Sequence, residues 1–341
     1  MERRVIDDGE RGAILTLTAL TLVGLVAVMA LVIDLGHLYV VKTELQRAAD
    51  AGAIAGAMDL FDIPPGSHYP VSITPNCSRA LTACQGIVGA NQADGSNLQL
   101  SSSDVTFGQW DTSTGSFVAT GCANPQGVTG VKVVVRKDQT LNGPVSLSFL
   151  GLLPGGWSRV DLSAQALGFN GYAGYAPPGA GVFPLAIDAN KAPPGHGGEL
   201  ITVHLSPTTG DSGCWHTFDD KSPGASDLRD LIDGTTPSPP LAVGDQIKAK
   251  EGVADSVLQT LKQQLDNNGG NWTVLCPVIS GDSHTGWLPV QGFVAFRLTE
   301  VNTSGGDKYL QGYTVPDYVA PGISPGGSNY GLWAGIPKLV Q

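Results

Sequence analysis

The chain has 341 residues and a formal net charge of -11, and no basic patch stands out along it. This balance excludes the basic surface with which most nucleic-acid-binding proteins hold phosphates, so we expect no nucleic-acid partner. With 46 glycines and 23 prolines, the chain stays below the level typical of a disordered low-complexity protein, and its length allows one large or two ordinary folded domains beyond an N-terminal segment.

The first feature in chain order is an uncharged, mostly apolar segment that begins at Ala13, ends at Ile33 and is closed by Asp34. As an α-helix it would span roughly 31 Å, which matches the hydrocarbon core of a bilayer. A cleaved signal peptide is the alternative, but its apolar part is shorter and ends at a small-residue cleavage site. The segment therefore predicts one retained transmembrane helix over 13–33.

The charges around this segment predict its orientation. Arg3, Arg4 and Arg11 precede it and Asp34 follows it, so the positive-inside rule places a short tail, 1–12, in the cytoplasm. We expect a single-pass protein of the inner or cytoplasmic membrane, with its body in the periplasm or outside the cell.

The next segment, 34–60, continues the helical pattern and is rich in small residues. Its apolar and small positions recur at steps of three and four: Leu38, Val41, Leu45, Ala48, Gly52 and Ala55. Glycine and alanine on one helix face allow another backbone to approach closely. We predict a close-packing assembly face formed by Ala48, Gly52, Ala55 and Gly56, against either a β module or a neighbouring subunit. Asp50, within this stretch, is either a solvated charge or the partner of a basic group on a neighbour.

This N-terminal region, 11–57, resembles the N-terminal segment of TadG-like proteins of the tight-adherence (Flp) pilus system. The matching features are short motifs before and after the apolar run: Arg11-Gly12, Asp34-Leu35-Gly36, Tyr39, Leu45-Gln46 and Ala48-Ala49-Asp50-Ala51. Some larger relatives carry a metal-dependent adhesion motif, but the corresponding stretch from Asp161 to Gln165 lacks its second serine. We therefore predict no such metal site.

The resemblance implies a non-catalytic, membrane-anchored component of a Flp pilus or its secretion apparatus, either similar to a pseudopilin or minor pilin or acting as an assembly factor. The partners implied are the membrane and other pilus or secretion-system proteins. The alternative is a stand-alone anchored module or hydrolase that recognises a glycan or a protein. Tryptophans suited to a sugar platform, or equally to core packing, are Trp110, Trp157, Trp215, Trp272 and Trp287.

Beyond residue 60 the pattern changes to short apolar runs separated by turn residues, which predicts β structure. A stretch rich in Gly, Pro and Tyr, 171–181, is the predicted linker between a first β module, 61–170, and a second β-rich module, 182–341. The expected strands are 105–110, 117–120, 131–136, 160–169, 182–187, 200–205, 273–279, 293–301 and 309–318, with helices at 226–232 and 253–265. The fold class is therefore α+β: a long N-terminal helix followed by predominantly β, loop-rich extracytoplasmic modules.

All five cysteines follow the apolar segment, where an oxidising compartment would favour disulfides. Metal ligation is less favoured because no CxxC motif occurs. The candidate disulfides are Cys77 with Cys84 and Cys214 with Cys276, leaving Cys122 free or exchanged for one of the first pair.

No catalytic motif is apparent. The most concentrated polar group in the second module is His204, His216, Asp219, Asp220 and His284, but these residues lack the spacing of a metalloprotease or a nucleophile elbow. We therefore predict a protein that is not an enzyme and has no cofactor, no metal and no small-molecule substrate.

Overall fold

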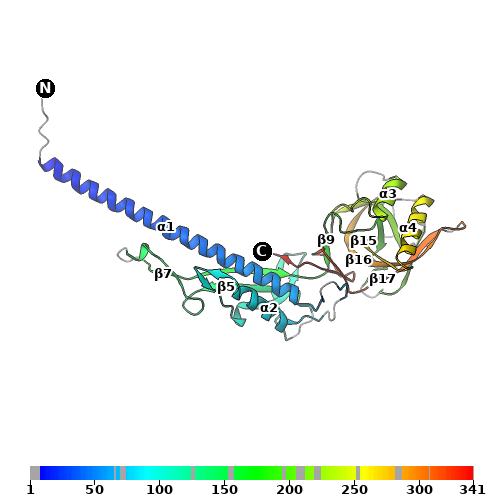
Figure 1. Cartoon of the computed structure of the whole chain (residues 1–341), viewed down its shortest axis with the longest axis horizontal. Coiled ribbons are helices and arrows are strands. Elements are labelled where there is room, and N and C mark those ends of the chain that lie inside the picture. Colours follow the sequence, from blue (N-terminus) through cyan, green and yellow to red (C-terminus); the bar gives the residue numbers. More distant parts are fainter. Residues whose placement is uncertain are drawn as a thin grey trace, which may run out of the picture.

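The structure, a computed structural model, describes residues 8–64, 67–69, 74–123, 127–152, 157–193, 197–204, 212–218, 224–250, 254–280, 286–306 and 308–340. It is elongated: the N-terminal half of helix α1 (Asp8–Asp59) projects from the body, and two β modules follow one another beyond it (Figure 1). The predicted α+β class is confirmed.

Helix α1 is continuous across the apolar segment and the small-residue extension. Its 52 residues give a length of about 78 Å at 1.5 Å per residue. No proline interrupts it before Pro64, and small and straight-chain side chains favour the helix throughout. Residues 8–12 of the predicted tail belong to α1, and residues 1–7 lie outside the described part of the chain.

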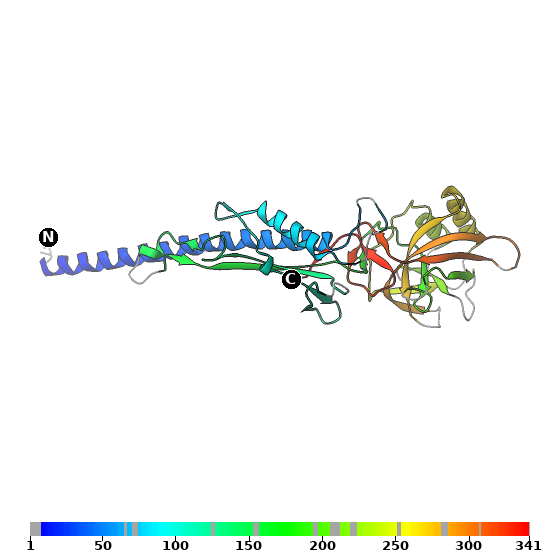
Figure 2. The same ribbon diagram turned by 90° about the horizontal axis from the view of Figure 1, so that it is seen from below.

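The first module is an antiparallel sheet that packs against the C-terminal half of α1 (Figure 2). Its strand order is β21-β8-β5-β3-β4. The bounds are β3 (Val105–Asp111), β4 (Ser116–Ala119), β5 (Gly130–Lys137), β8 (Leu162–Phe169) and β21 (Lys338–Leu339). Along β5, Val131, Val133 and Val135 alternate with less buried residues and share a core with α1, as the period of two in a strand requires.

Helix α2 (Cys77–Gly89) packs beside α1, although the sequence had predicted only β structure in this region. The Asn76 side chain caps it by accepting a hydrogen bond from the backbone N–H of Arg79 at 3.0 Å, which satisfies one of the free donors at a helix start. Ala80, Cys84 and Val88 form its buried face.

Short elements complete the first module at the end of the sheet nearer the apolar segment. These are β1 (Gln92–Ala93), β2 (Ser96–Asn97), η1 (Ser102–Asp104), β6 (Val145–Ser146), η2 (Leu150–Leu152) and β7 (Arg159–Val160). Strands β6 and β7 pair with each other and form a hairpin that contains η2.

The second module contains a closed ring of strands. Strand β15 pairs with both β10 and β16, so β16-β14-β12-β10-β15 close on themselves, and β17 and β11 extend the sheet from β16. The bounds are β10 (Leu185–Asp188), β11 (Leu200–His204), β12 (Gly213–Thr217), β14 (Gln246–Lys250), β15 (Trp272–Ile279), β16 (Gly286–Asn302) and β17 (Tyr309–Val315). Helices α3 (Ala225–Ile232) and α4 (Asp255–Asn267) cover one face and contribute to its core.

The predicted linker 171–181 is a structural junction rather than a free connection. It contains β9 (Ala173–Ala176), which pairs with β13 (Leu241–Ala242) and β19 (Ser324–Pro325). Gly174 is required here because a Cβ would lie 2.5 Å from the backbone of Gly326. Glycine in this stretch therefore permits close packing, and composition alone does not distinguish that role from flexibility.

The chain also returns from the second module to the first. Strand β18 (Tyr318–Ala320) pairs with β20 (Leu332–Ala334), and β21 then adds to the edge of β8 in the first sheet. The C-terminal residues predicted for the second module are thus shared between both.

The structure has the alternative in which Cys122 replaces Cys84 as the partner of Cys77, and neither the Cys77–Cys84 nor the Cys214–Cys276 disulfide is formed. Cys77 pairs with Cys122, with the Cα atoms 6.3 Å apart, and the thiols of Cys84, Cys214 and Cys276 are free and buried. Cys77 and Cys84 share α2, about 10 Å apart along the axis, which exceeds the reach of a disulfide. Cys214 and Cys276 lie on strands separated by β10 and belong to different cores.

Candidate functional site

The candidate site is the end of the first module that lies nearest the apolar part of α1. Ala13 lies within α1, and most side chains from Ile14 to Ile33 are exposed along it. This is the one described helix that is long and apolar enough to cross a bilayer. The Thr18 and Thr21 hydroxyls donate to the carbonyls of Ile14 and Leu17 at 2.8 and 2.9 Å, so they enter an apolar phase with their donors satisfied.

Asp34 ends the apolar run and also binds the β6–β7 hairpin. Its side chain is 1% exposed, and its carboxylate accepts backbone N–H groups from Ser148 at 2.9 Å, Phe149 at 3.0 Å and Leu150 at 2.6 Å. Burial raises the pKa of Asp34, but these three donors outweigh it and hold the pKa below the ordinary value of 3.8. The carboxylate therefore binds the start of η2 and the two residues before it, and fixes this part of the hairpin to α1.

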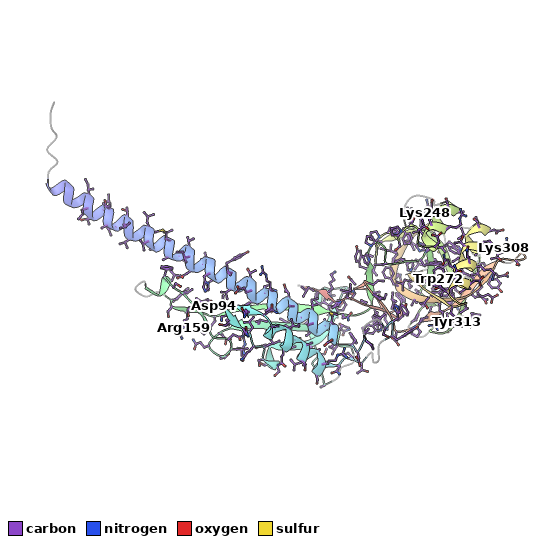
Figure 3. All side chains as sticks on the ribbon, in the orientation of Figure 1. Asp94, Arg159, Lys248, Trp272, Lys308 and Tyr313 are labelled. Atoms are coloured by element: carbon purple, nitrogen blue, oxygen red, sulfur yellow. A yellow bond between two sulfur atoms is a disulfide. The ribbon has the colours of Figure 1, made fainter. Side chains whose placement is uncertain are left out.

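A second group of polar contacts lies one turn further along α1. His37 Nε2 is 3.3 Å from a carboxylate oxygen of Asp94, and Lys137 Nζ is 3.8 Å from the other. The backbone N–H of Asp94 donates to the Glu44 carboxylate at 2.8 Å. Asp94, which is labelled in Figure 3, therefore joins the β1–β2 turn and the end of β5 to α1.

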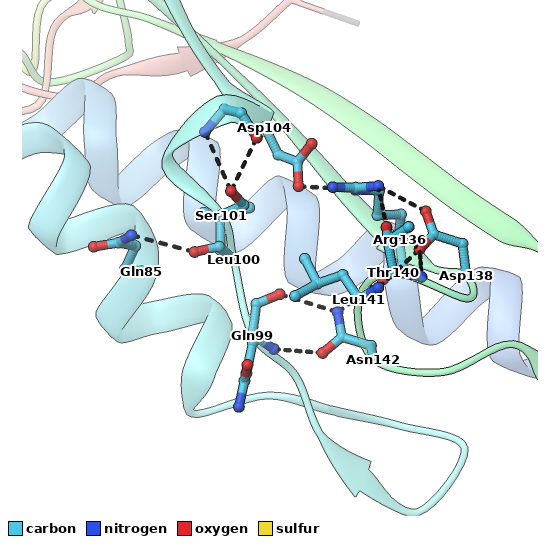
Figure 4. Close-up of polar contacts among 11 residues, drawn as sticks. Gln85, Gln99, Leu100, Ser101, Asp104, Arg136, Asp138, Thr140, Leu141 and Asn142 are labelled. Atoms are coloured by element: carbon cyan, nitrogen blue, oxygen red, sulfur yellow. Dashed lines mark hydrogen bonds and ion pairs between the residues drawn. The ribbon is translucent and has the colours of Figure 1, made fainter.

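The turn after β5 is held by an arginine and an asparagine (Figure 4). Arg136 donates from Nε to Asp104 at 2.9 Å and from Nη1 to Asp138 at 2.8 Å. Hydrogen bonds to these two carboxylates raise the pKa of Arg136. Asn142, with a φ of 62°, bonds to the backbone of Gln99 in both directions at 2.7 and 3.0 Å. These contacts fix the chain where it leaves the sheet toward β6.

The predicted assembly face is occupied inside the chain. Ala48, Gly52 and Gly56 are buried, and Ala55 is partly exposed. A Cβ on Gly52 would lie 2.7 Å from a methyl of Val88, and one on Gly56 would lie 2.4 Å from the sulfur of Cys84. In this structure the small residues therefore allow α2 and the sheet to approach α1.

Gly168 on β8 has the matching role on the sheet, and sequence reasoning did not identify it. A Cβ at this position would lie 2.2 Å from the carbonyl oxygen of Ala53 and 3.1 Å from the Cβ of Ala57. The backbones of α1 and β8 thus meet where both residues are small. A glycine at the end of an alternating apolar strand is the sequence signal for such an approach.

Asp50 is partly exposed and accepts a hydrogen bond from the Gln46 side chain at 2.8 Å. The same Gln46 amide donates to the carbonyl of Gln165 on β8 at 3.0 Å. Asp50 thus orients a side chain that connects α1 to the sheet.

Of the polar group considered in the second module, the structure describes His204 and His216, which lie in separate contacts. His216 is buried, with Nε2 3.0 Å from the carbonyl oxygen of Phe183, whereas the His204 ring packs near Tyr309. Asp219, Asp220 and His284 lie outside the described residues. Among the residues that the structure describes, no three His, Cys, Asp or Glu side chains are grouped as metal ligands.

The tryptophans are distributed over both modules. Trp215 is buried and Trp272 packs edge-on against Phe183, with the ring centroids 5.4 Å apart. Trp287 lies beside Lys248, and Trp157 is exposed on the β6–β7 hairpin. Trp110 is on β3 of the first sheet. These positions do not place the five rings on one element.

Comparison with known proteins identifies the helix. Residues 12–59 match the family model described as putative Flp pilus-assembly TadE/G-like. The chain carries a TadE/G-like domain. This domain coincides with α1 and ends where α1 ends, so the resemblance noted in the sequence is confirmed for the anchor and its extension. No curated protein and no solved structure matches the chain.

The TadE/G-like domain and the exposed apolar helix together support a pilus-associated membrane component with a single N-terminal anchor. The family is generally non-enzymatic. The β modules lie beyond the matched segment.

Proposed function

We propose that the protein is a non-catalytic component of a Flp pilus or its secretion apparatus, anchored in the cell membrane with its modules outside the cytoplasm. The observation that carries this proposal is the division of α1, the TadE/G-like helix: one end is bare and apolar, and the other is built into a β module. The Cys77–Cys122 disulfide supports an oxidising compartment for that module.

The surface of α1 that remains available for partners lies opposite the small-residue face. Leu35, Tyr39 and Val40 are exposed just beyond the apolar segment, and Met58 is exposed further along. On a helix with 3.6 residues per turn these four positions fall within one broad stripe. Because the small-residue face is filled by α2 and the sheet, we assign assembly contacts to this stripe.

Gly36 lies within the same stripe and is open. A Cβ at Gly36 would meet no atom within 4 Å, so nothing inside the chain requires glycine there. A glycine on an exposed helix surface lets a second helix approach closely. We therefore propose that a helix of a pilus or secretion-system partner packs over Gly36.

A Gly36→Leu substitution tests this contact without disturbing the fold. It adds bulk where the chain has open space, and replacing helical glycine favours the helix by about 1 kcal/mol. The expected result is a folded, membrane-inserted protein that no longer supports normal piliation. Piliation is measured as the amount of filament sheared from the cell surface, and an immunoblot for the second module in these filaments and in washed membranes locates the protein.

Thr112→Leu, on the exposed turn between β3 and β4, is the matched control and should leave piliation unchanged. Full-length or trimmed protein in the filaments would indicate a minor pilin. Protein confined to membranes, with defective piliation in its absence, would indicate an assembly factor. Normal piliation after deletion of the whole protein would overturn the proposed function.

A further inference from the structure

The β6–β7 hairpin extends from the first module toward the bare half of α1. Strand β7 lies beside α1, on the anchor side of β5 and α2, in two perpendicular views (Figures 1 and 2). The backbone N–H of Leu147 donates to the carbonyl of Ser158 at 2.9 Å, which closes the hairpin beyond the paired strands. The tip, described at 147–152 and 157–158, reaches the level of Asp34.

The tip packs on α1 at the outer end of the predicted transmembrane segment. Helix η2 contacts α1, and its first residue, Leu150, supplies one of the three N–H donors to Asp34. The other two come from Ser148 and Phe149, directly before η2. Ala30, one turn closer to the N-terminus, is only 6% exposed, although most side chains of the apolar run are exposed. Four helical residues correspond to about 6 Å, so a tip that covers Ala30 overlaps the outer part of the span by about that depth.

The side chains of the tip suit the membrane interface. Phe149 is 41% exposed and Trp157 is 74% exposed, and neither position is required for a core at this place. Aromatic residues, tryptophan above all, concentrate at the level of the lipid headgroups. Arg159 is exposed at the base of the hairpin on the same side of α1 (Figure 3), where its long side chain can reach anionic headgroups.

We propose that the β6–β7 hairpin is a second membrane contact, with Phe149 and Trp157 inserted in the interfacial region of the outer leaflet beside α1. The occupant of this apolar surface is lipid, because the hairpin packs on a part of α1 that is itself at bilayer depth. An insertion of about 5–10 Å is typical of interfacial segments, and the overlap with Ala30 agrees with it.

The position of the hairpin at the membrane interface explains why Asp34 accepts three backbone hydrogen bonds. Backbone N–H groups that enter the interface away from water must find acceptors inside the protein. The carboxylate supplies acceptors for the amides of residues 148–150, and the Arg136 and Asn142 contacts hold the root of the hairpin to the sheet. The membrane contact would therefore fix the rotation of the first module about α1.

The experiment uses the full-length chain with Phe149→Cys, labelled with an environment-sensitive fluorophore and reconstituted in phosphatidylcholine–phosphatidylglycerol vesicles. The free cysteines of the described structure are buried and the other two are paired, so the introduced thiol is the accessible one. The unsubstituted chain measures background labelling. Trp157→Cys is the second variant, in case Phe149→Cys does not fold.

Thr112→Cys is the control, because its exposed turn lies beyond the opposite end of the sheet. The expected result is a blue-shifted emission at 149 relative to 112, and quenching by lipids that carry a nitroxide near the headgroup. Water-like emission at both tip positions would overturn the proposal. Blue-shifted emission without quenching by nitroxide lipids would also overturn it, because the tip would then be covered by a second copy of the chain.

Discussion

Asp34 has two roles: it ends the apolar segment and it binds the β6–β7 hairpin. A charge at the end of an apolar helix limits how far the helix enters the bilayer. Here the same charge is buried and saturated by three backbone N–H groups from a segment 114 to 116 residues away. The residue that ends the span thus also attaches the hairpin that lies beside it.

The Asp34→Asn substitution should loosen the hairpin while leaving α1 in the membrane. An amide oxygen is a weaker acceptor than a carboxylate, and charge-assisted bonds are roughly twice as strong as neutral ones. We expect faster hydrogen exchange at the amides of Ser148, Phe149 and Leu150, measured by mass spectrometry on the reconstituted protein. Asp50→Asn, whose carboxylate accepts from Gln46, is the control and should leave these amides protected.

The pH dependence has a defined sign. The folded-state pKa of Asp34 is lowered, so its stabilising effect is fully present above the unfolded value of about 4. It is lost as the pH falls through the lowered folded-state pKa. Exchange at residues 148–150, corrected for the intrinsic rate, should therefore stay slow at neutral pH and rise only in strong acid. An unchanged exchange rate in Asp34→Asn would contradict the assignment.

At the scale of elements, the packing of α1 against α2 depends on positions that have no side chain. Gly56→Ala would place a methyl group 2.4 Å from the Cys84 sulfur and 3.0 Å from Val131. Overpacking of this kind costs about 1–3 kcal/mol, which exceeds the gain of about 1 kcal/mol from helix propensity. We expect a lower free energy of unfolding for the first module in urea.

The double variant Gly56→Ala with Cys84→Ala identifies the cause of that loss. Removing the sulfur relieves the closest contact, so the double variant should be less destabilised than the sum of the two single changes. Gly36→Ala is the matched control on the same helix, because its Cβ meets nothing, and it should raise stability. Additive effects of the two substitutions would show that the close approach at Cys84 is not the cause.

The elements that sequence predicted well are those whose residues repeat with one period. The apolar segment continued into 34–60 predicts α1, which ends at Asp59. The alternating strand 131–136 corresponds to β5, and the apolar run 273–279 corresponds to β15. In α1 and β5, the spacing of the apolar residues along the chain predicts both the type of element and the face that is buried.

The elements that sequence missed depend on distant partners. Helix α2 is short and has small residues on its buried face, so its stability comes from packing on α1 rather than from propensity. Because Cys77 and Cys84 both lie on this helix, they are too far apart to pair, and Cys77 pairs with Cys122. At the candidate site, Asp34 was predicted as a boundary, but its donors on the hairpin follow only from the three-dimensional arrangement.

For the whole molecule, the important feature is how the second module is joined to the anchor. Strands β18 and β20 contribute alternate side chains to two cores: Val319 and Trp333 to that of the first module, and Ala320 and Leu332 to that of the second. Because side chains alternate between the two faces of a strand, the β18–β20 pair contributes one face to the core of each module. The second module should therefore be held at a fixed orientation to α1.

Trp333 is the central contact between the β18–β20 pair and the first module. Its ring lies 4.6 Å from that of Phe61 and 4.5 Å from that of Tyr172, measured between centroids. Phe61 follows the end of α1, so the indole connects the anchor helix to the strands that return from the second module. Trp333→Ala should cost about 3–5 kcal/mol, as truncation of a buried tryptophan generally does.

The expected consequence of Trp333→Ala is a loss of fixed orientation between modules rather than unfolding of the second module, whose closed ring of strands does not include β20. Small-angle scattering on the detergent-solubilised protein should show a wider distribution of particle dimensions. Trp287→Ala, at a partly exposed ring on β16, is the control and should leave the distribution unchanged. If both variants scatter alike, β18 and β20 do not hold the modules together. If only Trp333→Ala broadens the distribution, Trp333 and its neighbours hold the second module at a fixed orientation to the anchor helix. The contacts that the second module makes with partners are then positioned by that helix.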